Sequence, residues 1–232
     1  MLGHPKSGTN WLCSVLSDYY DIPVFKAWLR VLPAVSPQIF HMHRFVPTAV
    51  ARRRTFYLYR DGRDILVSRF FAIVRSKYDD RAKQAFERYT GVPMAEQQIR
   101  EQLPAFIDWS FQGNQGSSVR WHAHVERAFR HPYVRLSYEA MKADTFAAVA
   151  RAIEEVSGVA ADPGRLKAAI AANAFEKKKA ADNAHFLRSG TTGDWRKHFS
   201  RAAAERFEGY ANRALVMLGY EAGSDWIETC TP

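Results

Sequence analysis

The chain has 232 residues, of which 47% are hydrophobic and 25% are charged. This composition allows a sizeable buried core and excludes a disordered or low-complexity chain. The formal net charge of +9 is compatible with nucleic acid, an anionic membrane or a multiply charged small ligand as the partner. Charge alone does not choose among these three.

Several features predict a cytoplasmic protein with one domain over residues 1–232. No apolar run approaches the ~20 residues of a membrane span. A charged, glycine-containing motif begins almost at the first residue, where a secretory signal would be apolar. The two cysteines, Cys13 and Cys230, are too few for a disulfide framework. The basic runs at 52–54 and 177–179 are interpreted as solvated surface.

The first motif is HPKSGTNW, residues 4–11, and it reads like a phosphate-binding loop with a displaced lysine. In a nucleoside triphosphatase, lysine and a magnesium-binding serine or threonine directly follow the last glycine. Here Thr9 and Asn10 occupy those two positions, and the lysine of the motif is Lys6. The sequence therefore predicts an anion-binding loop that lacks the arrangement of a triphosphatase.

Residues 9–20 predict a helix, because their apolar side chains recur on one face. Gly8 and Thr9 would then lie at the helix N-terminus, where N–H groups and the helix dipole attract anions. Only residues 1–3 precede the loop. The first strand is therefore either very short or begins upstream of residue 1.

Three short stretches rich in aromatic and β-branched residues predict buried strands, at 38–43, 55–60 and 133–138. Helical segments follow the second and third of these, at 64–77 and 139–156. The alternation predicts a three-layer α/β fold, in which a mostly parallel sheet is flanked by helices. Ligands of such sheets bind beyond the carboxyl ends of the strands.

Two further stretches contain candidate anion ligands. Arg60 ends the second predicted strand and Ser68 lies two helical turns later, so both can grip one phosphate. The alternative is a surface network of Arg60 with Asp61 and Asp64. The glycine-containing loop at 186–195 can bring N–H groups to an anion, or it is an ordinary turn between helices.

Taken in chain order, these stretches resemble the sulfotransferases that use 3'-phosphoadenosine 5'-phosphosulfate (PAPS). The resemblance covers roughly residues 3–199, and a C-terminal segment adds to it. The matching stretches are the phosphosulfate loop PKSGTNWL (5–12), the 3'-phosphate motif YRDGRDILVS (59–68), the adenine-side segments LSYEAMKAD (136–144) and NAFEKKK (173–179), the donor loop LRSGTTGDWRKHF (187–199) and the C-terminal helix ANRALVMLGYE (211–221).

The resemblance implies a donor site that works without a metal ion. It implies that Lys6 neutralises the charge that develops as the sulfuryl group leaves. The other implied donor residues are Ser7, Gly8, Thr9 and Asn10 at the 5'-phosphate, Arg60, Ser68, Arg188, Ser189 and Gly190 at the 3'-phosphate, and Trp11, Tyr138 and Phe175 around adenine.

The general base of this family is a histidine that follows a strand, in the order Lys–Thr–His. FHMHRF, residues 40–45, offers His41 and His43. Strand alternation points both side chains the same way, so spacing does not choose between them. Matching the motif makes His43 the base and puts His41 in the lysine position, with a shared role for His41 left open. A neutral imidazole is suited to accept a hydroxyl proton near pH 7.

Some positions depart from the family pattern. Asn10 replaces a threonine whose donor function an amide can keep. Ser189 stands where many members have lysine, which leaves more of the 3'-phosphate charge to Arg60 and Arg188. Asn173 and the alanine after it replace Thr and Ser, so only Phe175 carries over from that segment.

The sequence thus predicts in-line sulfuryl transfer from PAPS to a hydroxyl group, with an amine as the second choice. The acceptor is expected to be a small molecule, a glycan or a lipid head group, not nucleic acid. Residues 75–130 are interpreted as a helical insertion near the acceptor, and residues 24–38 and 76–120 as its pocket. The aromatic residues expected there are Trp28, Phe86, Tyr89, Phe106 and Trp109.

Two alternatives belong to other classes of protein. A kinase-like phosphotransferase would share the loop fold, but it needs a lysine after Gly8 and a magnesium ligand at position 10. A basic, non-enzymatic module for nucleic acid or acidic polysaccharide would explain the charge, but not the ordered motifs. The sequence makes no prediction of the oligomeric state.

Overall fold

The protein is described by a computed structural model over residues 1–26, 37–45, 55–76, 80–112, 120–174 and 190–231. The chain divides into two compact units. The first unit comprises residues 1–60 and 127–183, and the second comprises residues 61–126 and 184–232.

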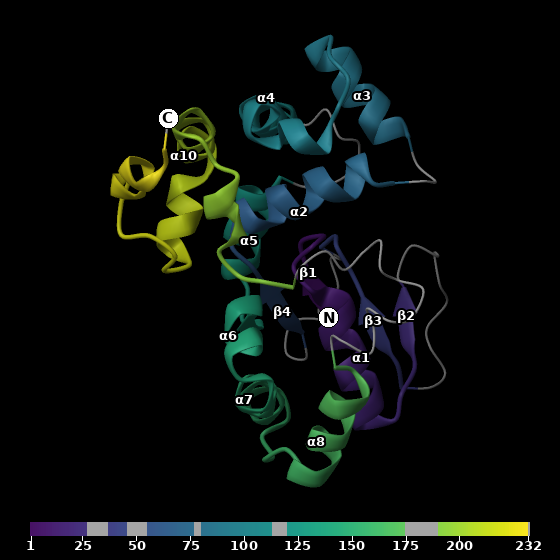
Figure 1. Cartoon of the computed structure of the whole chain (residues 1–232). Helices are drawn as coiled ribbons and strands as arrows, with labels where there is room; N and C mark the ends of the chain where they lie inside the picture. The colour runs from purple at the N-terminus through teal and green to yellow at the C-terminus, as the bar shows by residue number, and fades with distance from the viewer. Residues whose placement is uncertain (27–36, 46–54, 77–79, 113–119, 175–189, 232) are drawn as a thin grey trace. The chain divides into compact units, whose positions relative to one another are not determined.

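The first unit contains both strands and helices, and the described elements of the second unit are helices (Figure 1). The strands are β1 (Leu2–Gly3), β2 (Val24–Lys26), β3 (Ile39–His41), β4 (Phe56–Tyr59) and β5 (Val134–Ser137). The α-helices are α1 (Thr9–Tyr20), α2 (Gly62–Val74), α3 (Arg81–Thr90), α4 (Ile99–Phe111), α5 (Trp121–Phe129), α6 (Tyr138–Ala143), α7 (Thr145–Ser157), α8 (Pro163–Ala172) and α10 (Arg201–Met217). Short 3-10 helices are η2 (Glu96–Gln98), η3 (Asp194–Lys197) and η4 (Asp225–Thr229).

The sheet of the first unit is parallel in every described pairing. β2 pairs with β3, and β4 lies between β1 and β5. A parallel bridge between Leu2 and Met42 joins β1 to the end of β3, and the Gly3 N–H donates to the Met42 carbonyl oxygen at 3.2 Å. The strand order is therefore β2-β3-β1-β4-β5, which confirms the predicted α/β class with a parallel sheet.

The chain reverses direction across the sheet at β1. The next strands, β2 and β3, lie on one side of β1, and β4 and β5 lie on the other side. Open α/β sheets bind ligands beyond the carboxyl ends of their strands at such a reversal. The loop of residues 4–8 leaves β1 at this point.

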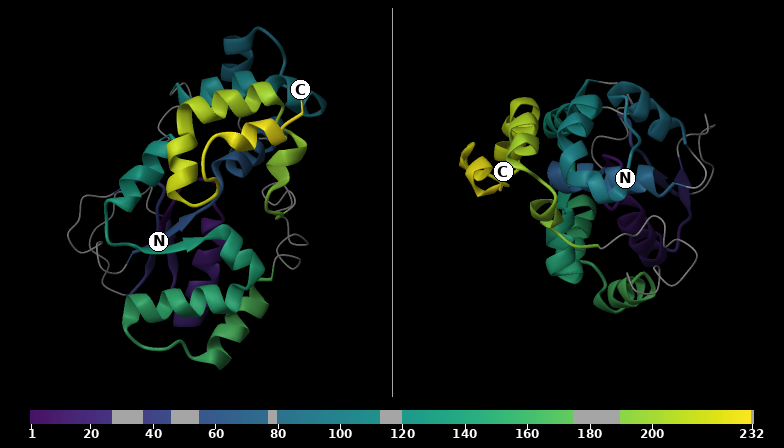
Figure 2. Two further views of the ribbon diagram at one scale, coloured as in Figure 1. Left: turned by 90° about the vertical axis from the view of Figure 1, so that its left-hand side faces the viewer. Right: turned by 45° about the horizontal axis from the view of Figure 1, so that its top comes forward.

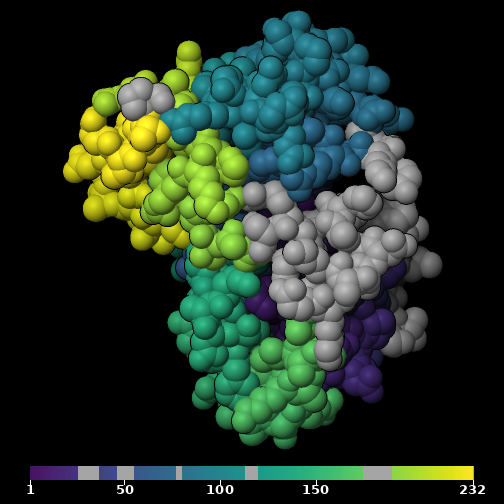
Figure 3. Space-filling view, viewed as in Figure 1, coloured from purple at the N-terminus to yellow at the C-terminus, as the bar shows by residue number. Residues whose placement is uncertain are grey.

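Alternate residues of β4 face opposite sides of the sheet, each into its own hydrophobic core. Phe56 and Leu58 belong to a core that α1, α7 and α8 complete. Tyr57 packs on the other face with Leu2 of β1 and Ala128 of α5. Helical residues therefore cover both faces, as the three-layer prediction requires. Figure 3 shows α8 (green) against α1 (purple) at the surface of this unit.

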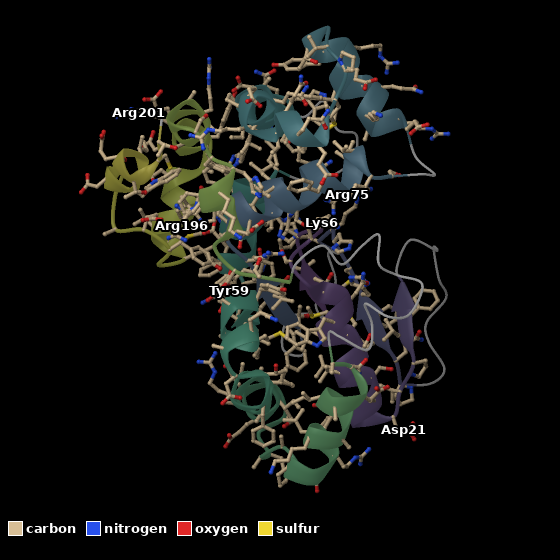
Figure 4. The ribbon with its side chains drawn as sticks, in the orientation of Figure 1. Lys6, Asp21, Tyr59, Arg75, Arg196 and Arg201 are labelled. Carbon is tan, nitrogen blue, oxygen red and sulfur yellow. The ribbon has the colours of Figure 1, made fainter. Side chains whose placement is uncertain are left out.

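Helix starts in the first unit are of two kinds. Ser137, Asp144 and Asp162 cap α6, α7 and α8, because each side chain accepts a backbone N–H three residues further on. In contrast, α1 begins after Gly8 with no side-chain cap. It ends at Asp21, which is labelled in Figure 4 and has a left-handed backbone with φ 53°. The uncapped start leaves the first turn of α1 without a side-chain acceptor for its N–H groups.

The aromatic residues expected to line an acceptor pocket include three that form a core in the second unit. Phe86, Phe106 and Trp109 are at most 1% exposed, and their ring centroids lie 5.6 Å apart. They hold α3 against α4, so that part of the pocket prediction is wrong. Tyr89 on α3 is 43% exposed, and Trp28 lies outside the described residues.

The C-terminal elements form a second aromatic contact in the same unit. Trp226 of η4 is buried against Phe207 of α10, with ring centroids 6.4 Å apart. Both views of Figure 2 show η4 (yellow) beside α10. Arg201, labelled in Figure 4, donates to both carboxylate oxygens of Glu228. That ion pair is solvent-exposed and adds little, so the buried rings hold the two elements together.

The structure differs from the sequence prediction at β2, which the sequence did not indicate. Val24–Lys26 is a three-residue strand directly after Pro23, too short for a period-2 pattern to show. Among the described helices, none combines the length and the apolar character needed to cross a bilayer.

The core role of Phe106 can be tested by truncation. Phe106→Ala should lower the free energy of unfolding by about 3–5 kcal/mol, because it leaves a cavity among buried rings. Urea denaturation followed by circular dichroism measures this. The matched control is Tyr89→Ala on the exposed face of α3, which should change stability by about 0.5 kcal/mol or less. Equal effects of the two substitutions would contradict the assignment of Phe106 to the core.

Candidate active site

The loop between β1 and α1 has an unusual backbone. Lys6 and Gly8 both adopt left-handed conformations, with φ 71° and φ 88°. Loops of this kind can aim successive N–H groups at one anion. A Cβ atom on Gly8 would lie 2.7 Å from the Tyr138 ring, so this position needs glycine for space as well as for its backbone angle. Figure 4 labels Lys6 ahead of α1 (purple).

The start of α1 adds to the anion-binding character of the loop. The N–H groups of Trp11 and Leu12 both donate to the Gly8 carbonyl oxygen, at 3.0 and 3.3 Å. The N–H groups of the preceding residues, Thr9 and Asn10, lie too early in the helix for an intrahelical acceptor. With no side-chain cap, they and the helix dipole favour a negatively charged ligand.

Arg60 stands at the carboxyl end of β4, next to this loop. It is 7% exposed, and its Nη1 donates to the Lys6 carbonyl oxygen at 3.3 Å. Its guanidinium carbon lies 4.3 Å from the centre of the Tyr138 ring, a cation–π contact. The Tyr138 ring also meets Trp11 edge to face, with centroids 6.1 Å apart. The structure thus brings together four residues that the sequence named separately.

Two polar groups of the loop region are buried without a hydrogen-bond partner among the described residues. They are the Ser7 hydroxyl and the Trp11 indole N–H. Buried donors are nearly always paired in folded proteins. Their lack of a protein acceptor fits a site whose ligand carries several oxygen atoms.

His43 is held by the main chain at the end of β1, directly before the loop. Its Nδ1 lies 2.7 Å from the Gly3 carbonyl oxygen. A carbonyl oxygen only accepts, so Nδ1 carries the proton and, in the neutral ring, Nε2 carries the lone pair. Burial lowers the pKa of His43 below its usual 6.5, against a smaller opposing effect of the Gly3 bond. The ring is therefore neutral near pH 7, with a basic nitrogen at Nε2.

His41 makes a different contact. Its Nε2 lies 2.8 Å from the Oγ1 of Thr9, the first residue of α1. The side chain of His41 is buried, and its ring centroid is 4.7 Å from that of His43. The two rings therefore lie side by side although β3 ends at His41, and their hydrogen bonds distinguish them.

The part of the YRDGRD motif that lies in the second unit, residues 61–64, makes buried contacts that the sequence did not reveal. Asp64 of α2 is 1% exposed and accepts the backbone N–H groups of Gly193 and Trp195, at 2.8 and 2.9 Å. Arg63 pairs with Asp61 and Glu221. These acids thus form buried anchors, which is not the surface network with Arg60 that was the alternative. Asp64 holds the glycine-containing loop in place.

Arg63 completes the anchor by stacking. Its guanidinium carbon lies 3.8 Å from the Trp195 ring centre and 4.6 Å from that of Trp226. A buried guanidinium near two indole rings gains cation–π attraction from both. Residues 129 or more positions apart meet here, which is why the sequence gave no local signal for it.

Two of the remaining predicted donor residues belong to the second unit. Ser68 lies on α2 and Gly190 begins the described C-terminal segment, both in the second unit. Phe175, Arg188 and Ser189 lie outside the described residues, as do the basic runs at 52–54 and 177–179.

Replacing Asp64 tests the anchor. Asp64→Asn should speed the exchange of the Trp195 amide hydrogen by about 10-fold, because a charged acceptor of two N–H groups becomes a neutral one with a single oxygen. Hydrogen exchange read by mass spectrometry on peptides from 190–200 measures this. The control is Asp80→Asn, since Asp80 precedes α3 without a capping bond. Unchanged exchange at Trp195 would contradict the anchoring role.

Comparisons with known proteins show the family of the chain. Human sulfotransferase 2A1 is 27% identical over 90% of this chain and 80% of its own length. The 3-beta-hydroxysteroid sulfotransferase of Cavia porcellus is 25% identical over 88% of this chain and 79% of its own length.

Two solved structures share the fold. Mouse sulfotransferase SULT7A1, complexed with PAP, superposes with a TM-score of 0.64 at 19% identity over 96% of this chain and 86% of its own. Retinol dehydratase, in a complex with retinol and PAP, superposes with a TM-score of 0.62 at 16% identity over 92% and 80%. The family model described as "Sulfotransferase domain" matches residues 26–219, most of the chain. As the order of its motifs predicted, the chain belongs to the sulfotransferase family of enzymes.

Proposed function

We propose that this enzyme moves the sulfuryl group of PAPS to a hydroxyl group of a small organic acceptor. The observation that carries the proposal is the hydrogen bond from His43 Nδ1 to the Gly3 carbonyl oxygen. It ties a neutral proton acceptor to the last residue of β1, directly before the anion-binding loop. Sulfuryl transfer to an alcohol needs these two functions side by side, because a proton leaves the acceptor as charge builds up on the donor.

The residues of the loop fit a donor that carries phosphate oxygens. The left-handed backbone at Lys6 and Gly8, the uncapped start of α1 and the unpaired Ser7 hydroxyl all favour such an anion. Bound PAPS would supply an electrophilic sulfuryl group on a phosphate leaving group. The solved relatives that carry PAP support this choice of co-substrate.

Each candidate residue of the site is then assigned a role in the reaction or in donor binding. Nε2 of His43 takes the acceptor's hydroxyl proton. Lys6 neutralises negative charge on the leaving phosphate oxygen, and the N–H groups at the start of α1 hold the 5'-phosphate. Trp11 and Tyr138 frame adenine. The 3'-phosphate is assigned to Arg60 with Ser68, Arg188, Ser189 and Gly190, and the far side of adenine to Phe175.

The acceptor is proposed to be an alcohol or phenol of small size. The relatives named as hydroxysteroid sulfotransferases, and the retinol complex of a structural relative, support this class. Steroid alcohols are therefore the first acceptors to test, with phenols, sugars and lipid head groups after them and amines last.

Selective binding of the 3'-phosphate tests the proposed function. PAP should bind about 100-fold more tightly than 5'-AMP, because a charge-assisted pair with arginine contributes about 1.5–3 kcal/mol. Arg60→Ala should shrink this ratio. The ratio is the readout, since Arg60 also holds the Lys6 carbonyl oxygen, and loosening the loop would weaken both nucleotides alike.

Isothermal titration calorimetry with both nucleotides measures the ratio. Arg135→Ala is the matched control, because Arg135 of β5 also donates to carbonyl oxygens, those of Phe129 and His131. It should leave the ratio unchanged. Equal affinity of the parent protein for PAP and 5'-AMP would overturn the assignment of the donor.

The role of His43 has its own test. His43→Ala should lower kcat by about 100-fold or more, the cost of a lost general base, and change the Kd of PAP by less than about 3-fold. Burial lowers the pKa of His43 below the usual 6.5, so the inactive protonated form predominates only at a pH below 6.5. The profile of kcat/KM against pH should therefore fall toward low pH with its midpoint below pH 6.5.

An alcohol acceptor serves for this profile, since its hydroxyl group does not titrate in the range. His131→Gln is the control, a histidine of the same unit away from the loop. If the decrease of kcat/KM at low pH (the acid limb of the profile) is still present in His43→Ala, or if its midpoint in the parent protein lies above pH 6.5, another group is the base.

A further inference from the structure

We propose that His41 is a positioning residue, which turns the hydroxyl group of Thr9 so that its proton points to the anion in the loop. In this role it is not a second general base. The inference rests on the proposed function, because it takes the anion to be a phosphate group of the donor.

The contact joins two elements that meet at the site. His41 ends β3 and Thr9 begins α1, and their Nε2 and Oγ1 atoms are 2.8 Å apart although the residues are 32 positions apart in sequence. Both side chains are buried, with His41 9% and Thr9 4% exposed. A hydrogen bond of this length forms either with Nε2 donating to the hydroxyl oxygen or with the hydroxyl group donating to Nε2.

The proton of the Thr9 hydroxyl can go to only one acceptor. A hydroxyl group has one proton and two lone pairs. If His41 Nε2 were unprotonated, it would take that proton, and Thr9 would present only lone pairs to an anion. If Nε2 is protonated, it donates to Oγ1, and the Thr9 proton is available to a phosphate oxygen. A hydrogen bond from the Thr9 hydroxyl group to an anion at the start of α1 therefore requires the proton on Nε2 of His41.

The two neighbouring imidazoles then carry their protons in opposite places. His43 is protonated on Nδ1 by its bond to the Gly3 carbonyl oxygen, so its Nε2 is the base. In the proposed arrangement His41 carries its proton on Nε2 and donates it to Thr9 Oγ1. Nε2 of His41 is then a donor and cannot take a proton from the acceptor. The two histidines, one at the end of β3 and one two residues later, have different roles because their hydrogen-bond partners differ.

A double-mutant cycle on PAP affinity tests the inference. His41→Leu should weaken PAP binding by about 10-fold, the usual effect of misdirecting one bond to a charged group. Thr9→Val should cost about the same. If His41 acts through Thr9, the double variant should bind no more weakly than Thr9→Val alone. His41→Gln keeps a side-chain N–H donor and should stay within about 3-fold of the parent protein.

Two further readouts separate positioning from a purely structural role and from a shared base. Long-range ¹H–¹⁵N spectra of the PAP complex at pH 8 should show His41 protonated on Nε2 and His43 on Nδ1. The acid limb of kcat/KM should keep its midpoint in His41→Gln. His41 unprotonated at Nε2 in the complex, or a limb that disappears in His41→Gln, would overturn the inference.

The cycle also distinguishes this inference from the proposed function. If the parent protein binds PAP and the two losses add in the double variant, the positioning role is wrong and the proposed function stands. If the parent protein shows no preference for PAP over 5'-AMP, the proposed function fails and the inference fails with it. The Gln variant keeps the test decisive if His41→Leu does not fold.

Discussion

The candidate site depends on the close packing of the backbone at Gly3. A Cβ atom there would lie 2.6 Å from the Thr9 methyl group and 2.7 Å from the Leu58 carbonyl oxygen, so α1 and β4 approach the main chain itself. The Gly3 N–H also donates to the carbonyl oxygen of Met42, the residue after β3, and the Gly3 carbonyl oxygen accepts a hydrogen bond from His43. One residue without a side chain therefore sets the positions of the loop, the helix start and the base.

The polar site is held together by hydrogen bonds to the main chain, whereas apolar side chains form the core. The sheet's alternation sends Phe56 and Leu58 to one core and Tyr57 to the other, and that packing supplies most of the stability. The site lies beyond the ends of the strands. The backbone N–H and carbonyl groups there are not used to pair strands, so they can bind side chains or a ligand. In the second unit Asp64 follows the same logic, since its carboxylate holds a loop by two backbone N–H groups.

Sequence reasoning succeeded where the signal is local. The aromatic runs that became β4 and β5, and the glycine loop before α1, have patterns within a few residues. It did not find β2, which is only three residues long. It also took Phe86, Phe106 and Trp109 for pocket residues, because composition does not tell a buried aromatic cluster from a lined cavity. The anchors of Asp64 depend on partners 129 and 131 positions away, and no local pattern reports such contacts.

Strain at Lys6 connects the fold to the proposed chemistry. A left-handed backbone costs a residue other than glycine about 1–2 kcal/mol, and Lys6 adopts it with φ 71°. Such a conformation persists when its surroundings determine it. Here Arg60, itself packed over Tyr138, donates to the Lys6 carbonyl oxygen. The arginine proposed to read the 3'-phosphate thus also fixes the backbone of the lysine proposed to meet the leaving group. Folding therefore fixes the Arg60 side chain and the Lys6 backbone before any ligand arrives, so an anion that binds there need not supply the energy of ordering these groups.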